Sequence, residues 1–105
     1  MMGMREFDLM KKNSYFIAVS RGGIYEMPGL VKALDSHQLA GAGVDVTDPE
    51  PLPKGHSLWK FDNVIVTPHN SGWTTGMVRR RWDEIAENLR RFAAGERLIN
   101  IVTTT

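Results

Sequence analysis

The sequence predicts an α/β protein: a parallel sheet of about three strands with flanking helices and a long C-terminal helix. Three short apolar runs, at residues 15–19, 42–46 and 64–66, are typical of buried strands, and the first is expected to be buried on both faces of the sheet. Segments with helically spaced apolar residues precede, separate and follow these runs. Short apolar strands that alternate with helices favour a parallel sheet.

The composition is that of an ordinary globular domain, with 42% apolar and 24% charged residues among 105. The net charge of +1 gives no reason to expect a nucleic acid or a membrane surface as partner. Cysteine is absent, which excludes disulfides, thiolate metal sites and a cysteine nucleophile, and suits a cytoplasmic protein. No apolar run approaches the ~18–20 residues of a membrane span. The N-terminus has no apolar signal core, so secretion is not expected.

The helices follow from apolar spacing and from the residues at their ends. A short helix is expected over residues 4–11, with Asn13 near its end, and a second helix begins at Pro28. The last helix runs from about residue 75 to 94, and Gly95 fits the position past its end. Its apolar stripe comprises Val78, Trp82, Ile85, Leu89 and Phe92. An extended apolar segment at 98–102 and a frayed tail at 103–105 complete the chain.

Polar side chains follow each of the three predicted strands. Ser20 and Arg21 follow the first strand, Asp45 ends the second with Glu50 five residues further on, and His69 follows the third. Ligands of parallel α/β sheets gather at the carboxyl ends of the strands. We therefore expect these residues to form one constellation at that edge.

The residue types of this constellation suit proton transfer on an anionic, oxygen-bearing substrate. An arginine such as Arg21 can grip a carboxylate with two parallel hydrogen bonds. His69 can take or give a proton near neutral pH, and a neighbouring carboxylate, that of Glu50, would stabilise the imidazolium and orient the ring. These three residues offer no nucleophile and no metal-ligand set. Hydride chemistry would need a cofactor to carry the electrons.

Four segments carry a family resemblance, in order and with matching spacing over nearly the whole chain. They are Phe-Ile-Ala-Val-Ser-Arg-Gly-Gly at 16–23, the segment 39–52 with Gly-Val-Asp-Val and a closing Glu-Pro-Leu, Asn-Val-Ile-Val-Thr-Pro-His at 63–69, and the closing helix and tail with Glu87-Asn88-Leu89, Gly95-Glu96 and Asn100-Ile101-Val102. Together they resemble the D-isomer-specific 2-hydroxyacid dehydrogenases. The resemblance implies a partial Rossmann-like sheet. Residues 1–74 would be the C-terminal half of the dinucleotide-binding domain, and residues 75–105 the helix and tail that return to the substrate domain.

The same resemblance implies an oxidoreductase that transfers a hydride between NAD(P)H and a 2-oxo or 2-hydroxy acid. Arg21 would bind the substrate carboxylate and carbonyl, His69 would be the general acid/base, and Glu50 would hold His69. Asp45 would accept a hydrogen bond from the nicotinamide carboxamide. The nicotinamide end of NAD or NADP would also lie along Val19, Ser20, Arg21, His69, Asn70, Ser71 and Gly72. No metal is implied, and a homodimer is the usual assembly.

The family's Gly-x-Gly-x-x-Gly turn, which holds the pyrophosphate, does not occur in these 105 residues. We therefore expect this polypeptide alone to bind NADH weakly or not at all. The residues that separate NAD from NADP and one substrate from another are absent too. A non-catalytic truncated remnant, or an interaction or dimerisation module of the same fold, is the alternative. A reading frame extending upstream of Met1 into such a turn would favour the enzyme.

Each residue of the constellation also has a simpler structural interpretation. Arg21 would then be a solvated turn residue, Glu50 a surface acid of a proline-rich loop, and His69 a capping or surface histidine. Asp45 would merely satisfy nearby backbone amides. Of the other histidines, His56 is predicted to be a solvated loop residue.

Overall fold

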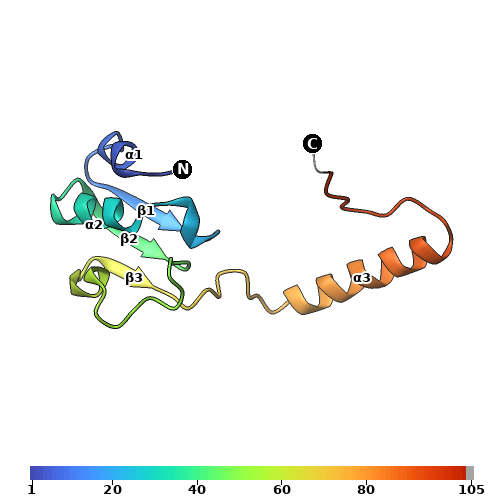
Figure 1. Cartoon of the computed structure of the whole chain (residues 1–105). Helices are drawn as coiled ribbons and strands as arrows, with labels where there is room; N and C mark the ends of the chain where they lie inside the picture. The colour runs from blue at the N-terminus through green and yellow to red at the C-terminus, as the bar shows by residue number, and fades with distance from the viewer. Residues whose placement is uncertain (104–105) are drawn as a thin grey trace. The chain divides into compact units, whose positions relative to one another are not determined.

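The computed structural model describes residues 1–103, and the predicted tail residues Thr104 and Thr105 lie outside them. The chain divides into two compact units, Met1–Ser71 and Gly72–Thr105 (Figure 1). The assignment of residues 1–74 to a dinucleotide-binding domain, and of residues 75–105 to a helix and tail that return to a substrate domain, stays a prediction.

The first unit is built on a three-stranded parallel sheet in the order β1-β2-β3. The strands are Ser14–Ala18, Leu39–Val44 and Val64–Val66. Two helices accompany them, α1 at Met4–Asp8 and α2 at Met27–Asp35, together with 3-10 turns at Gly22–Ile24 and Ser57–Lys60. This arrangement confirms the predicted α/β class with about three parallel strands.

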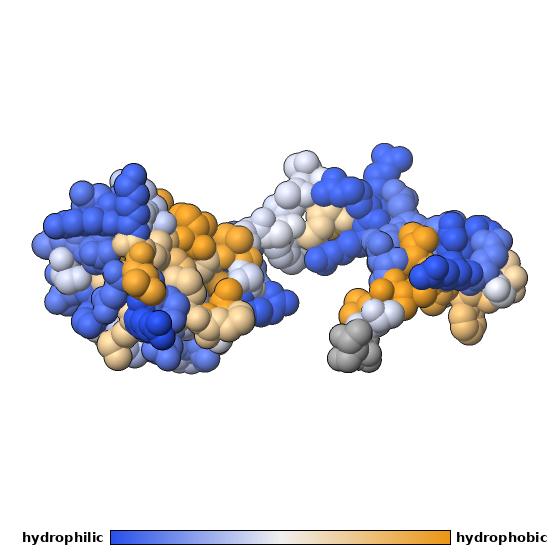
Figure 2. Space-filling view, turned by 90° about the horizontal axis from the view of Figure 1, so that it is seen from above, coloured by the Kyte–Doolittle hydropathy of each residue, from blue (hydrophilic) through white to orange (hydrophobic). Residues whose placement is uncertain are grey.

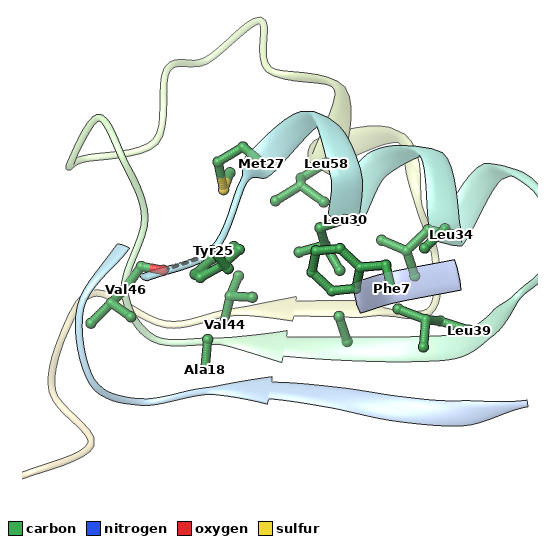
Figure 3. Packing of buried hydrophobic residues seen from close by; sticks show 12 residues of the cluster. Phe7, Ala18, Tyr25, Met27, Leu30, Leu34, Leu39, Val44, Val46 and Leu58 are labelled. Atoms are coloured by element: carbon green, nitrogen blue, oxygen red, sulfur yellow. Dashed lines mark hydrogen bonds between the residues drawn. The ribbon is translucent and has the colours of Figure 1, made fainter. Parts of the chain in front are cut away.

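The core of the first unit lies between its helices and one face of the sheet (Figure 3). Its largest fully buried side chains, each less than 2% exposed, are Phe7, Leu30, Leu34, Leu39, Val44, Val46 and Leu58. Phe16 joins α1 to the turn region through edge-on contacts with Phe7 and Tyr25, at ring-centroid distances of 5.0 and 5.2 Å. Burial of this apolar surface is the main favourable term in the stability of the unit.

The other face of the sheet corrects one expectation. Residues 15–19 were expected to be buried on both faces, but Tyr15 and Ile17 are 69% and 65% exposed. Their neighbours Phe16 and Ala18 point to the helix-covered face and are partly or fully buried. The prediction is therefore wrong for one face, because the helices among the described residues of this unit cover only the other.

Element boundaries agree with expectation in some places and differ in others. The third strand is as predicted. The first helix ends at Asp8 rather than near residue 11, and β2 ends at Val44, so Asp45 lies just beyond the strand. Gly95 has a left-handed φ of 68° just past α3, as expected. Asn13 is also left-handed, with φ of 62°, but it lies in the turn before β1, so the prediction that it ends the first helix is wrong.

The second unit contains α3 at Met77–Ala93. The five apolar residues of its predicted stripe are 47–77% exposed, and Figure 2 shows hydrophobic surface on both units among hydrophilic residues. The predicted extended segment at 98–102 forms no strand among the described residues. It is tied to α3 by two hydrogen bonds between Asn88 and the main chain of Ile99. No helix in the described part of the chain is long and apolar enough to cross a membrane.

Candidate functional site

The three strands deliver their following residues to one edge of the first unit. β1 continues into Ser20 and Arg21, β2 into Asp45, and β3 into Thr67 and the loop that carries His69. Main-chain hydrogen bonds hold these ends together beyond the strands: the Asp45 N–H donates to Ala18 O (2.8 Å) and the Thr67 N–H donates to Val44 O (3.0 Å). The parallel topology thus assembles the predicted constellation.

Glu50, His69 and Arg21 form a row at this edge. The Oε2 atom of Glu50 lies 3.0 Å from Nδ1 of His69, and Nη1 of Arg21 lies 3.5 Å from Nε2 on the other side of the ring. A guanidinium can only donate, so the neutral ring accepts at Nε2 and carries its proton on Nδ1, facing Glu50. The side chains of His69 and Glu50 are 41% and 40% exposed, so the row is open to solvent.

Arg21 stands on a turn whose next residue must be glycine. Its Nη1 donates to the main-chain oxygen of Ser20 at 2.7 Å. Gly22 follows, and a Cβ there would lie 2.1 Å from the main-chain oxygen of Thr47. No side chain fits at that distance, and the missing Cβ lets the Arg21 turn approach the segment between Asp45 and Glu50.

Asp45 is buried, with 3% of its surface exposed. Its Oδ1 accepts hydrogen bonds from the hydroxyl of Thr67 (2.6 Å) and the main-chain N–H of Asn70 (2.9 Å), and its Oδ2 accepts one from the main-chain N–H of Ser71 (2.9 Å). Burial raises the pKa of the Asp45 carboxyl, but the hydrogen bonds from Ser71, Thr67 and Asn70 outweigh it and hold that pKa well below its usual range. Asp45 is therefore ionised at neutral pH.

The other residues predicted to meet the nicotinamide are arranged in two ways. Val19 and Ser20 are exposed at the end of β1. Asn70 and Ser71 close the loop over the Asp45 carboxylate, while Gly72 belongs to the second unit. The described residues contain no group of three or more side chains that could hold a metal ion.

A mostly apolar hollow of about 350 Å³ adjoins the Glu50–His69 pair. Pro51, Leu52, Trp59 and Val66 supply apolar wall, with Trp59 fixed by a 2.8 Å hydrogen bond from its indole N–H to the main-chain oxygen of Pro53. His56 lies in a loop, as expected, and is half-buried there. Its Nδ1 accepts the Leu58 N–H and caps the 3-10 turn that carries Trp59.

Two contributors to the site carry no strong sequence signal. Thr67 holds Asp45, although its Thr-Pro-His motif drew attention only to the histidine. Tyr25 is buried and donates its hydroxyl to the main-chain oxygen of Val46 at 2.6 Å. Burial, and to a lesser degree the negative charge of Glu50, raise the pKa of Tyr25 to about 12, so it remains a donor that anchors the start of the Glu50 loop.

A parallel sheet with acid, base and arginine at its carboxyl edge defines an α/β domain of the class that binds ligands at strand ends. Residues 1–71 match the family model described as "D-isomer specific 2-hydroxyacid dehydrogenase, NAD binding domain". The chain therefore belongs to the D-isomer specific 2-hydroxyacid dehydrogenase family.

Named relatives agree with that assignment. Glyoxylate reductase of Thermofilum pendens is 42% identical over 87 residues, which cover 83% of this chain and 26% of the relative. D-3-phosphoglycerate dehydrogenase of Escherichia coli K12 is 40% identical over 97 residues, covering 89% and 24%. The crystal structure of a D-isomer specific 2-hydroxyacid dehydrogenase from Xanthobacter autotrophicus Py2, in complex with NADPH and MES, has a TM-score of 0.86 and 38% identity, covering 95% and 40%. The chain thus spans about a quarter of the length of the two curated relatives.

Proposed function

We propose that this chain supplies the acid–base residues and the nicotinamide end of an NAD(P)-dependent 2-hydroxyacid dehydrogenase. The observation that carries the proposal is the row formed by Glu50, His69 and Arg21, with separations of 3.0 and 3.5 Å. The row places the cation of Arg21 beside the proton donor of His69. A 2-oxo acid requires such a pair, because its carboxylate binds a cation and its carbonyl oxygen takes up a proton on reduction.

In reduction of a 2-oxo acid, Arg21 binds the substrate carboxylate and polarises the neighbouring carbonyl. His69, protonated at both ring nitrogens, donates the Nε2 proton to the carbonyl oxygen as that oxygen gains negative charge. Glu50 accepts from Nδ1 throughout, stabilising the imidazolium and keeping Nε2 aimed at the substrate. The hydride would come from NAD(P)H when that cofactor is bound. In the oxidative direction, the neutral His69 ring takes the hydroxyl proton at Nε2.

The residues at the strand ends fit the nicotinamide end of the cofactor. Val19 offers an exposed apolar side chain and Ser20 an exposed small one, beside which a flat ring can lie. The buried carboxylate of Asp45 is ionised, and an ionised carboxylate is the kind of acceptor that a carboxamide N–H requires. We propose NAD or NADP, without a preference between them.

We further propose a cytoplasmic homodimer acting on a small 2-oxo or 2-hydroxy acid. The absence of cysteine supports the location. The exposed apolar stripe of α3 and the exposed sheet face support association. The same exposed surfaces favour a second candidate, a non-catalytic interaction or dimerisation module. Sedimentation of the purified chain measures association, and enzyme assays separate the two candidates.

The decisive experiment is a chimera in which these 105 residues replace the matching segment of Thermofilum pendens glyoxylate reductase. We expect NADH- or NADPH-dependent reduction of a 2-oxo acid. His69→Ala should lower turnover roughly 10²- to 10⁴-fold and leave cofactor binding largely intact. His37→Asn, at a remote left-handed position with φ of 55°, is the matched control and should keep turnover. Unchanged turnover in His69→Ala would remove His69 from the mechanism.

A further inference from the structure

We propose that Asp45 and Thr67 are positioning residues that fix the loop at 67–71 and thereby direct the His69 imidazole toward Glu50 and Arg21. The inference rests on the acid–base role of His69 proposed above. It assigns Asp45 a role beyond an acceptor for nicotinamide, and it gives Thr67 a role in the site.

The backbone of His69 needs such support. Its φ is 52°, in the left-handed region that side-chain-bearing residues rarely adopt. A residue keeps such an unfavourable φ only where contacts with the surrounding structure hold its backbone in place. If φ of His69 relaxed to an ordinary value, the Cα–Cβ bond would turn and the ring would leave its place between Glu50 and Arg21.

The contacts of Asp45 enclose His69 on both sides along the chain. The Thr67 hydroxyl, two residues before His69, and the main-chain N–H groups of Asn70 and Ser71, directly after it, all donate to the Asp45 carboxylate at 2.6–2.9 Å. The His69 N–H itself donates to the main-chain oxygen of Asp45 at 2.8 Å. Asp45, directly after β2, thus holds four residues of the loop that follows β3.

The negative charge of Asp45 makes these hydrogen bonds necessary for the stability of the loop. The carboxylate is buried, and no salt bridge found among the described residues includes it. A buried anion without a cationic partner must be compensated by hydrogen-bond donors. The loop at 67–71 supplies them, and the low pKa of Asp45 agrees with that compensation. The charged groups that face the imidazole are Glu50 and Arg21, so Asp45 acts on the ring through the backbone.

The test uses the 105-residue chain without cofactor or substrate. Thr67→Val keeps the shape of the side chain and removes its hydroxyl. The ring ¹⁵N shifts of His69, recorded where the imidazole is neutral, report whether the proton stays on Nδ1. We expect Thr67→Val to reduce that preference and to speed hydrogen exchange of the Asn70 and Ser71 amides by about 10-fold, the effect of one lost hydrogen bond. Thr67→Ser should restore both.

Two further variants keep the result unambiguous. Asp45→Asn keeps the volume and removes the charge, and it should change the same readouts in the same direction and more strongly. Ser14→Ala removes a 2.6 Å hydroxyl hydrogen bond at the far end of β1 and should change neither. Amide shifts of β1 and α2 report whether each variant is folded. A native His69 tautomer in folded Thr67→Val and Asp45→Asn would overturn the proposal. Because no turnover is measured, that result is distinct from failure of the chimera assay.

Discussion

Glu50 Oε2 accepts the Nδ1 proton of His69 across 3.0 Å, although the two residues follow different strands. The contact fixes which ring nitrogen is free to face Arg21 and, by the proposed mechanism, the substrate.

Glu50→Gln is therefore expected to reduce turnover of the chimera roughly 10²-fold, because an amide neither stabilises the imidazolium nor enforces the Nδ1–H tautomer. Steady-state assays with a 2-oxo acid measure it, with Asp48→Asn, a charge removal two residues away, as control. Equal losses in both variants would assign the effect to general electrostatics of the loop.

Arg21→Lys should raise KM for the 2-oxo acid at least about 10-fold, with a smaller effect on cofactor binding. Lysine keeps the charge but cannot form two parallel hydrogen bonds to a carboxylate, and one charge-assisted bond is worth about 1.5–3 kcal/mol. Arg79→Lys on the exposed side of α3 is the control and should be silent. An unchanged KM in Arg21→Lys would mean that the substrate carboxylate binds elsewhere.

Gly22→Ala and Gly23→Ala should differ sharply, although the glycines are neighbours. A Cβ on Gly22 would lie 2.1 Å from a main-chain oxygen, whereas the nearest atom to a Cβ on Gly23 is 3.9 Å away. Urea unfolding of the chain should show Gly22→Ala less stable by about 1–3 kcal/mol, a typical cost of overpacking, and Gly23→Ala close to the parent. Similar stability of the two variants would mean that the turn has room to move.

The stability of the first unit should fall as acid protonates Asp45. A carboxyl whose pKa is lower in the folded than in the unfolded state stabilises the fold above its unfolded value, here 3.8, and that contribution is lost as the pH falls further. Unfolding midpoints from pH 7 down to about pH 2 should therefore drop less steeply for Asp45→Asn than for the parent. Asp62→Asn, at an exposed aspartate, serves as control. Parallel pH profiles for the parent and Asp45→Asn would contradict the low pKa.

The 105-residue chain alone should bind NADH weakly or not at all, because its sequence holds no Gly-x-Gly-x-x-Gly turn to receive the pyrophosphate. Fluorescence titration of NADH measures this, and the chimera provides the positive control. Micromolar binding by the chain alone would show that the nicotinamide end suffices.

The elements could be predicted where local signals are strong. A short β-branched run predicts the strand Val64–Val66. A proline marks the start of α2, and a glycine marks the end of α3. The exposure of Tyr15 and Ile17 could not be predicted from the sequence. An uninterrupted apolar strand is expected to be covered on both faces, whereas coverage depends on which other elements are present.

The site could be predicted as a set of residues but not as a geometry. Strand ends and the parallel topology brought Arg21, Glu50 and His69 together as expected. Hydrogen bonds from backbone amides to Asp45 were one of the two interpretations of the sequence. The identity of the donors, the Thr67 hydroxyl and the N–H groups of Asn70 and Ser71, could not be predicted, because it depends on how the loop after β3 folds. The requirement for glycine at position 22 could likewise not be predicted, because it arises from the close approach of the Thr47 main chain in the folded structure.

The left-handed backbone of His69 has a consequence for how this position tolerates change. Glycine adopts that conformation without strain, and asparagine does so more readily than most residues. A saturation library of the chimera should therefore be ranked differently by abundance and by turnover. Abundance would enrich the residues that relax most easily into the turn, and turnover would retain histidine. The difference between the two rankings would measure how much stability the protein loses by keeping histidine, which the chemistry requires, at this position.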